Sequence, residues 1–238
     1  MSTPTPFPQG SLIVSCQADE TSPFGAPEFI RAFAHAALEG GAQGLRLEGT
    51  ASIRAVRPMT DLPVIGLIKR RSASQPVYIT PEPADVWAYA EAGADIVAFD
   101  ATLRARPTSV ESLVIAAHAC GALALADISS VQEAQEALLA GADLISTTLS
   151  GYTPYSPQLP EPDLQLVSDL AARGIYALAE GRIRTPAQAQ EALSRGAFAV
   201  VVGSAITRPE VVTTWFREAL EQTAPGRAPG ADPRPVSG

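Results

Sequence analysis

The stretch YALAEGRIRTPAQAQEALSRGAFAVVVGSAITR, residues 176–208, decides the fold. Two short apolar runs, 176–179 and 199–202, enclose an alanine-rich segment, and Thr185-Pro186 at the front of that segment is a typical helix start. Apolar runs this short on either side of a helix are typical of buried parallel strands in a β-α-β unit. The stretch therefore predicts one repeat of a parallel α/β fold.

The ends of these two predicted strands carry a carboxylate, glycines and a serine. Glu180 and Gly181 follow the first run, and Gly203 and Ser204 follow the second. Functional groups in parallel α/β units collect at the carboxyl ends of the strands. A short turn at Gly203-Ser204 can aim backbone N–H groups at an anion such as phosphate. The plain alternatives are a surface carboxylate at Glu180 and an ordinary glycine turn.

The strand-then-helix unit repeats along the chain. Gly41, Gly93, Gly141 and Gly196 each stop a predicted helix just before a buried strand, because glycine permits the left-handed conformation of a helix C-cap. About eight such strands predict a protein of the α/β class, a (β/α)₈ TIM barrel in a single domain. A doubly wound open sheet is the alternative, although no GxGxxG follows a first strand.

Periodicity and helix breakers place the individual elements. Besides the opening stretch, we expect strands at 12–16, 44–47, 64–68, 96–99, 123–126 and 144–149, with 76–80 as a short extra strand or extended loop. Helices are expected at 27–40, 85–91, 108–119, 134–140, 163–173 and 209–222, with capping-box spacing at Thr108/Glu111 and Ser130/Glu133. Residues 1–10 are predicted to be a flexible N-terminus, 11–222 the barrel domain, and 223–238 a disordered Pro/Gly-rich tail.

Charge and cysteine content narrow the classes of partner. The 238 residues include 17 Lys and Arg against 25 Asp and Glu, and the formal charge of −8 argues against a nucleic-acid partner. Cys16 and Cys120 lie in apolar runs, so we expect small core residues without a disulfide framework, in keeping with a reducing cytoplasm. We find no signal-peptide pattern and no run long enough to span a bilayer, so no membrane partner is expected.

A closed barrel would bring polar residues from separate strands to one face. Lys69 ends an apolar strand, where partial desolvation favours the neutral amine that can act as a base or form a Schiff base. With Glu180 it can form an acid–base pair that removes a proton next to a carbonyl. A lysine that reaches over the rim to solvent is the plain alternative. The complete strand-end set is Gln17, Arg46, Lys69, Asp127, Thr147, Glu180, Gly203 and Ser204.

Two charged residues of this set have two interpretations each. Arg46 lies inside a strand, where an unpaired charge is costly, so it either pairs with Glu48 or another acid or holds a substrate oxygen. Asp127 is either a ligand for sugar hydroxyls or a partner for Lys69. No His/Asp/Glu cluster at the strand ends has metal-ligand spacing, so no metal is expected.

Four segments follow one another in a specific order: GLIKR (66–70), TTLSGYT (147–153), AEGRI (179–183) and VVVGSAITRP (200–209). The GSAI signal alone is weak, since many phosphate-binding barrels carry something like it, but the ordered set is specific. The set resembles the N-acylglucosamine-6-phosphate 2-epimerase family, whose members interconvert N-acetylmannosamine 6-phosphate and N-acetylglucosamine 6-phosphate. The resemblance runs from about residue 12 to residue 220 and departs at 71–75 and in the tail.

The resemblance implies a (β/α)₈ barrel with no cofactor and no metal. It also implies a homodimer, a hexosamine 6-phosphate as the small-molecule substrate, and a place in sialic acid and amino-sugar catabolism. In this family pattern Lys69 resembles the catalytic acid/base and Glu180 its carboxylate partner. Gln17, Arg46 and Asp127 resemble substrate-binding residues, to which we add Thr147. The phosphate-binding group that the resemblance implies is Gly181, Arg182, Gly203, Ser204 and Arg208.

The predicted reaction removes and returns the proton at C2, which lies beside the aldehyde of the open-chain sugar. Lys69 takes the proton as a neutral amine, and Glu180 assists ring opening or polarises the O1 region. Whether one base or two serve the two faces of C2 is left open. The alternatives are a Schiff-base aldolase or lyase on a phosphorylated sugar acid, an enzyme for a thiazole- or indole-type phosphate, and a non-catalytic sugar-phosphate-binding barrel.

Overall fold

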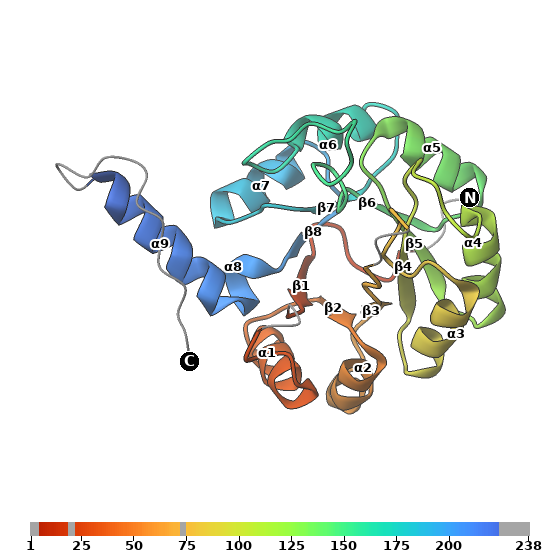
Figure 1. Ribbon diagram of the computed structural model, residues 1–238, viewed down its shortest axis with the longest axis horizontal. Helices are drawn as coiled ribbons and strands as arrows, with labels where there is room; N and C mark the ends of the chain where they lie inside the picture. Colours follow the sequence, from red (N-terminus) through yellow and green to blue (C-terminus); the bar gives the residue numbers. More distant parts are fainter. Residues whose placement is uncertain (1–4, 19–21, 72–74, 224–238) are drawn as a thin grey trace.

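Eight parallel strands close into a barrel in which consecutive strands pair and β8 pairs back to β1 (Figure 1). The computed structural model describes residues 5–18, 22–71 and 75–223. The closed strand order confirms the predicted single-domain (β/α)₈ TIM barrel and excludes the open sheet. The strands are β1 Leu12–Cys16, β2 Gly44–Glu48, β3 Val64–Leu67, β4 Ile96–Asp100, β5 Leu123–Asp127, β6 Leu144–Ser146, β7 Leu178–Glu180 and β8 Ala199–Val202.

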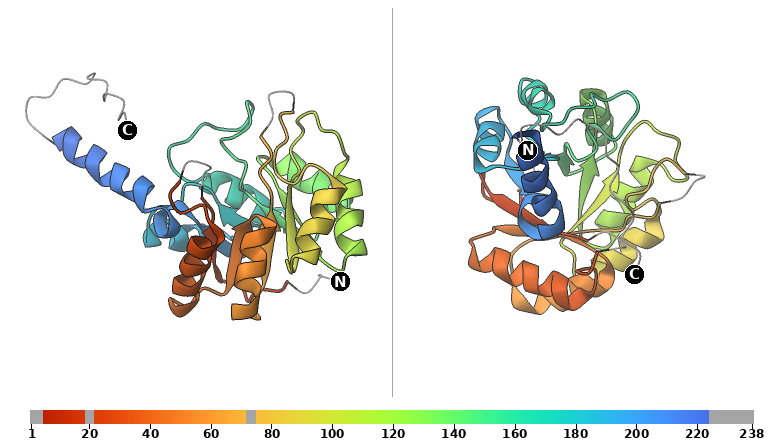
Figure 2. Two further views of the ribbon diagram at one scale, coloured as in Figure 1. Left: turned by 60° about the horizontal axis from the view of Figure 1, so that its bottom comes forward. Right: turned by 60° about the vertical axis from the view of Figure 1, so that its left-hand side comes forward.

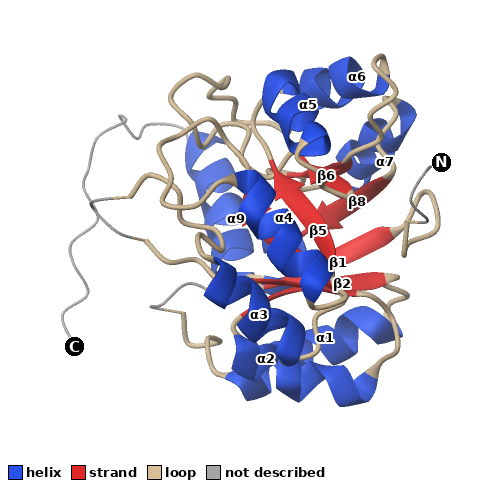
Figure 3. Cartoon of the chain, turned by 90° about the vertical axis from the view of Figure 1, so that its right-hand side faces the viewer, coloured by secondary structure: helices blue, strands red, loops and turns tan. Residues whose placement is uncertain are grey.

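Helices form an outer layer around the strands (Figure 3). None of the helices in the described part of the chain is long and apolar enough to cross a membrane. The helices are α1 Pro27–Glu39, α2 Thr50–Val56, the 3₁₀-helix η1 Arg57–Met59, α3 Pro83–Glu91, α4 Val110–Ala119, α5 Val131–Leu139, α6 Leu164–Ala171, α7 Pro186–Ser194, α8 Ser204–Thr207 and α9 Pro209–Thr223.

Side chains alternate between the two faces of each strand, which divides the core into a layer inside the barrel and a layer between strands and helices. Ile13 and Ile65 pack with other buried residues inside the barrel, whereas the adjacent Val14 and Val64 pack in the layer between strands and helices. This arrangement follows from the two-residue period of a strand, which sends successive side chains to opposite faces. Because both faces are buried, the strands read in the sequence as continuous apolar runs.

The segment before β1 closes the amino end of the barrel. Phe7 is 3% exposed and belongs to the inner apolar layer, and its ring occupies the space beside Gly44 that a Cβ there would need. The predicted flexible N-terminus, 1–10, therefore does not hold at Phe7, and its first four residues lie outside the described part of the chain. Almost all of the predicted disordered tail, 223–238, also lies outside the described residues, since only Thr223, the last residue of α9, is described.

The glycines at the ends of the repeats have the predicted conformation. Gly41, Gly93, Gly141 and Gly196 have φ of 88°, 106°, 95° and 99°, which lie in the left-handed region that a residue with a Cβ rarely adopts. Each glycine reverses the chain after a helix and sends it directly into the next strand, which confirms the repeat.

Several local predictions were wrong. The N-cap of α4 is Ser109, whose Oγ accepts a hydrogen bond from Ser112 N at 3.2 Å, and not Thr108. Cys120 is exposed beyond the end of α4 and is not a core residue, whereas Cys16 is buried and its burial raises the pKa of the thiol to about 12. Helix α2, directly after β2, was not predicted.

The last helix leaves the barrel. Helix α9 confirms the predicted helix at 209–222, but it projects away from the strands in two different views (Figures 1 and 2). It follows the single-turn helix α8 at the point of the chain where the eighth barrel helix usually comes, but it does not pack against the strands there. Phe216 on α9 is 70% exposed.

Gly66 on β3 offers a test of the packing between strands and helices. A Cβ at this position would lie 2.8 Å from the Cβ of Ala94 and 2.8 Å from Cδ1 of Ile53. We expect Gly66→Ala to lower the free energy of unfolding by about 1–3 kcal/mol, because the outer layer has no room for the methyl group. Urea denaturation measures this loss.

The matched control is Gly40→Ala at the exposed end of α1. A Cβ there would make only contacts of 3.4 Å with backbone oxygens, and the backbone is in the helical region. This variant should keep the wild-type stability. Equal losses in the two variants would show that the packing at Gly66 is not the cause.

Candidate active site

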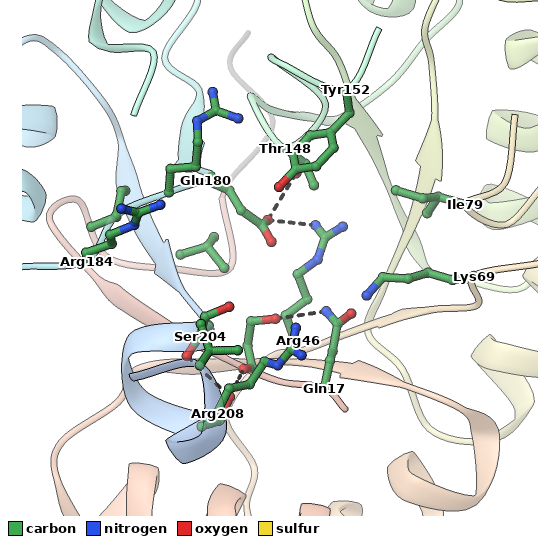
Figure 4. A pocket seen from close by; sticks show the side chains of 18 of the residues that line it. Gln17, Arg46, Lys69, Ile79, Thr148, Tyr152, Glu180, Arg184, Ser204 and Arg208 are labelled. Carbon is green, nitrogen blue, oxygen red and sulfur yellow. Dashed lines mark hydrogen bonds and ion pairs between the residues drawn. The ribbon is translucent and has the colours of Figure 1, made fainter. Parts of the chain in front are cut away.

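A pocket of about 380 Å³ opens at the carboxyl ends of the strands (Figure 4). Its lining includes ends of β1, β2, β3, β7 and β8, the loop after β6, and residues of α8 and α9. Long side chains from opposite strands meet here because all strands of the barrel point the same way. Most of the site residues that the sequence predicted on separate strands therefore line one cavity, and the two that do not are Asp127 and Thr147.

The pocket is strongly cationic although the protein is acidic. Of its lining residues in the described part of the chain, six are cationic and one is a carboxylate, Glu180. Charges gathered in a cavity with low-dielectric walls attract the opposite charge more strongly than charges scattered over a surface. The lining therefore favours an anionic ligand. The six cations are Arg46, Lys69, Arg71, Arg182, Arg184 and Arg208.

Arg46 of β2 is the buried centre of the site. Its side chain is 1% exposed, and its guanidinium forms a two-pronged ion pair with Asp127 of β5, with N–O distances of 3.1 Å and 2.6 Å. Nη1 also lies 3.2 Å from Oε2 of Glu180 on β7. Burial lowers the pKa of Arg46, but the charges of Asp127 and Glu180 outweigh this effect and raise it. Arg46 thus pairs with other acids and not with Glu48.

Glu180 ends β7 and points into the pocket from the side opposite Lys69 (Figure 4). Oε2 of Glu180 lies 3.0 Å from the hydroxyl of Thr148, which also contacts Asp127 at 2.7 Å. Burial raises the pKa of the Glu180 carboxyl, and the neighbouring charge of Asp127 adds to the rise, against the attraction of Arg46. A carboxyl that keeps its proton to higher pH is suited to act as a general acid.

Lys69 follows β3 and reaches the pocket from the other side. Its Nζ lies 3.2 Å from Oε2 of Glu48, and its backbone N–H donates to Oε1 of the same residue at 3.3 Å. A single antiparallel bridge joins Lys69 to Ile79, so the region 76–80 is an extended loop and not a full strand. Glu48 therefore holds both the backbone and the amine of Lys69.

Two polar atoms at this end of the pocket have no partner among the described residues. They are Oε1 of Gln17 and Nε of Arg46, and both are buried. Gln17 donates from Nε2 to Oγ of Ser15 at 2.8 Å, which fixes the amide against β1. An unpaired buried donor and acceptor are costly in a folded protein, and such groups often mark a binding site.

The predicted phosphate-binding residues lie on the loops after β7 and β8. Gly181 has a φ of 115°, and Gly203 directly precedes α8, so both turns bend sharply beside the pocket. Ser204 and Arg208 line the side of the pocket opposite Lys69 (Figure 4). Nε of Arg208 donates to Oε1 of Glu210 at 3.0 Å.

Arg182 lines the pocket but its guanidinium serves the loop after β6. Nε donates to the carbonyl of Glu161 and Nη1 to the carbonyl of Ser150, each at 2.9 Å. The guanidinium carbon also lies 5.8 Å from the ring centre of Tyr152. Arg182 therefore holds the loop that places Tyr152 in the pocket wall, and its contact with phosphate stays a prediction.

Asp127 and Thr147 lie behind the pocket wall. Asp127 is fully buried against Arg46, and it is neither a pocket residue nor the partner of Lys69 in this structure. Oγ1 of Thr147 donates to the carbonyl of Glu180 at 3.0 Å and accepts from its N–H, which joins β6 to β7. Both residues support groups that face the cavity, and their direct contact with a substrate stays a prediction.

Four residues of the site, Glu48, Thr148, Arg184 and Trp215, are missing from the site predicted from the sequence. Glu48 was considered only as a partner of Arg46, and Thr148 is the neighbour of the predicted Thr147. Arg184 stands two positions after Arg182 in the same loop, which was a usable signal. Nothing in the local sequence places Trp215, which reaches the pocket from α9.

The Arg46–Asp127 pair predicts a loss of stability when one partner is removed. We expect Asp127→Ala to lower the free energy of unfolding by about 3–5 kcal/mol, because a buried guanidinium loses its main counter-charge. Urea denaturation is the measurement. Glu191→Ala, which breaks an exposed pair with Arg195 on α7, is the control and should cost about 0.5 kcal/mol or less. A similar small cost for both variants would contradict the role given to Asp127.

Comparison with known proteins agrees with this site. A sequence profile of the family described as putative N-acetylmannosamine-6-phosphate epimerase matches residues 30–222. A putative N-acetylmannosamine-6-phosphate 2-epimerase of Klebsiella pneumoniae is 52% identical over 212 residues, which cover 89% of this chain and 90% of the relative. The bifunctional enzyme NanE/NanK of Brucella melitensis is 51% identical over 221 residues, which cover 93% of this chain. The chain spans only 43% of that relative.

Comparison with solved structures also finds an N-acetylmannosamine-6-phosphate 2-epimerase. The N-acetylmannosamine-6-phosphate 2-epimerase from Clostridium perfringens has a TM-score of 0.86 and 42% identity, over 89% of this chain and 93% of that one. A dihydropteroate synthase from Xanthomonas albilineans, with a TM-score of 0.57 and 16% identity, shares the fold alone. The profile match and the identity to full-length relatives show that the chain belongs to the N-acetylmannosamine-6-phosphate epimerase family.

Proposed function

We propose that the protein interconverts N-acetylmannosamine 6-phosphate and N-acetylglucosamine 6-phosphate by moving the proton at C2. The observation that carries this proposal is that Lys69 and Glu180 face each other across a pocket whose other side is lined by arginines (Figure 4). This arrangement suits a substrate with an acidic C–H at one end and an anion at the other. The relatives from Klebsiella and Clostridium, both named as N-acetylmannosamine-6-phosphate 2-epimerases, support the same assignment.

Lys69 moves the C2 proton in this proposal. C2 lies beside the C1 aldehyde of the open-chain sugar, so removal of its proton leaves an enolate of the 2-acetamido aldehyde, with its negative charge on O1. The amine of Lys69 accepts the proton, and Glu48, 3.2 Å from Nζ, holds the ammonium that results. Return of a proton to the opposite face of C2 inverts that carbon. The second proton comes either from Lys69 again or from Glu180.

Arg46 and Glu180 act on the oxygens of the substrate. The guanidinium of Arg46 is fixed by two carboxylates before the substrate arrives, and its Nε has no partner among the described residues. A positive charge that is already in place stabilises the developing enolate oxygen without reorganisation. Because burial raises the pKa of Glu180, this carboxyl can donate a proton to the ring oxygen and assist ring opening.

Gly181, Gly203, Ser204 and Arg208 hold the phosphate in this proposal. All four line the pocket, and Ser204 and Arg208 lie across it from Lys69, which separates the anion from the carbon that loses its proton. Tight binding of a remote group positions the reacting carbon and contributes to the rate. The steps use only side chains of the protein, and we propose that no cofactor takes part.

Proton NMR of N-acetylmannosamine 6-phosphate with the purified protein in D₂O and EDTA tests the function. We expect N-acetylglucosamine 6-phosphate to appear with deuterium at C2. Formation of pyruvate or another cleavage product would replace the proposal with a lyase. A folded protein that leaves the substrate unchanged would reduce the site to a phosphate-binding one.

Lys69 is the only lysine in the sequence, which makes its role unusually easy to test. We expect Lys69→Ala to lower kcat by at least about 10³-fold, because the group that accepts the C2 proton is lost. The measurement is the rate of C2 epimerisation, with circular dichroism as the check on folding. Near-wild-type activity would remove Lys69 from the mechanism.

An experiment on Lys69 also distinguishes a proton-transfer mechanism from one that passes through an imine. Borohydride added during turnover would reduce an imine to a stable amine adduct, and an internal adduct could only lie on Lys69. Proton transfer predicts no mass change on the peptide that contains Lys69. A substrate-derived mass on this peptide would favour the Schiff-base aldolase.

We also propose a cytoplasmic location and a role in amino-sugar and sialic acid catabolism. Cys16 and Cys120 are both free thiols, as is usual in a reducing compartment. A sugar phosphate is charged and does not diffuse across a lipid bilayer. An enzyme for such a substrate therefore works in the compartment where the sugar is phosphorylated.

We propose that the protein is a homodimer in which α9 of each copy packs against the barrel of the other. An apolar groove of about 490 Å³ runs along α7, β8 and β1, beside α8, where the eighth helix of a barrel usually packs. Leu12, Leu193 and Val202 line this groove. Helix α9 instead projects outward with Phe216 exposed (Figure 1). A second copy supplies a helix of suitable apolar character for the groove.

Sedimentation equilibrium tests this assembly. The wild-type protein should show twice the chain mass of 24.8 kDa, and Phe216→Asp should shift the equilibrium toward the single chain, because it places a charge in an apolar interface. Leu139→Asp on α5, at a side chain that is 88% exposed, is the control and should leave the mass unchanged. A wild-type protein that sediments as a single chain would exclude the dimer.

A further inference from the structure

Arg184 is a pocket residue that the proposed reaction does not use. It stands in the loop between β7 and α7, where its N–H and that of Thr185 donate to Oε1 of Gln188 at 2.8 Å and 3.2 Å. Gln188 and Thr185 form the capping box at the start of α7. The backbone of Arg184 is therefore fixed, and its side chain starts from a defined position at the edge of the pocket.

The guanidinium of Arg184 stacks on an aromatic ring. Its central carbon lies 4.9 Å from the ring centre of Trp215, and both residues line the pocket. Arginine on the face of tryptophan is held by the ring quadrupole while its N–H groups stay free at the edge of the plane. Trp215 thus acts as a platform that presents these donors.

Arg184 also differs from Arg46, Arg182 and Arg208 in the partners of its guanidinium. Arg46 faces two carboxylates, Arg208 is paired with Glu210, and Arg182 donates to two backbone carbonyls. In the part of the chain that the structure describes, Arg184 makes no ion pair and its guanidinium makes no hydrogen bond. Its positive charge is therefore available to a ligand.

The position of Arg184 matches one end of the proposed substrate. Figure 4 shows Arg184 on the same side of the pocket as Ser204 and Arg208, across from Lys69. A phosphate monoester carries close to two negative charges at neutral pH, with several acceptor oxygens that the planar fork of an arginine can bind in pairs. A dianion can accept more than one arginine.

We propose that Arg184, held by Trp215, is a second arginine for the phosphate group and selects phosphorylated over neutral hexosamines. This inference rests on the proposed function and adds to it a residue from outside the barrel, since Trp215 belongs to α9. The helix that leaves the barrel thus completes the phosphate end of the pocket. Arg184 binds the substrate far from C2, so it affects binding more than the proton transfer.

Kinetics of Arg184→Met test the inference. We expect KM for N-acetylmannosamine 6-phosphate to rise about tenfold while kcat changes less than about twofold, because a charge-assisted hydrogen bond at a remote group is lost. Arg184→Lys should restore part of the affinity, since it keeps the charge but not the fork. Arg173→Met, after α6 at the opposite end of the barrel, removes the same charge and should leave KM unchanged.

Fluorescence gives a second measurement that needs no turnover. Trp87 and Trp215 are the two tryptophans, so in a Trp87→Phe background the emission reports on Trp215 alone. Inorganic phosphate should change this emission along a saturating binding curve. Arg184→Met should weaken the binding and so raise the half-saturating phosphate concentration about tenfold. The titration tests Arg184 even if the wild-type protein does not epimerise the sugar.

The outcomes separate the two proposals. An active wild-type protein in which Arg184→Met changes neither KM nor the phosphate titration would overturn the role of Arg184 and leave the epimerase function intact. An inactive wild-type protein that binds phosphate through Arg184 would overturn the function and keep the anion site. A lower kcat with unchanged KM would place Arg184 in the chemical step and contradict the inference.

Discussion

The carboxyl end of the barrel depends on one buried guanidinium. Arg46 on β2 is held by Asp127 on β5 and Glu180 on β7, so a single charge joins three strands across the interior. A charge in this place without its partners would be too costly for a folded domain to retain. The pairing therefore explains both why an arginine interrupts an apolar strand and why Glu180 turns inward rather than toward solvent.

The same interaction sets the chemical properties of the pocket. Burial raises the pKa of the Glu180 carboxyl, Arg46 lowers it, and the charge of Asp127 adds to the rise. Lys69 has its own counter-charge in Glu48, on the strand that carries Arg46. Separate partners thus hold Lys69 and Glu180 on opposite sides of the cavity, which suits the acid and base roles that we propose for them.

The charges of this acidic chain are sorted in space. The negative formal charge belongs to the whole sequence, whereas five arginines and Lys69 converge on one cavity. Asp127 pairs with Arg46 and not with Lys69, whereas its contact with a sugar stays a prediction. Cys120 was expected in the core but lies on the exposed end of a helix.

The sequence by itself determined the repeat, the glycine turns and the polar ends of the strands. Apolar periodicity and the need for positive φ at a residue such as Gly196 are local properties, so they can be read without a fold. Only the tertiary structure decided the partners. Arg46 and Asp127 are 81 residues apart, and Trp215 reaches Arg184 from a helix outside the barrel. Such contacts depend on how the barrel closes and where each side chain points, which the spacing of residues along the chain does not encode.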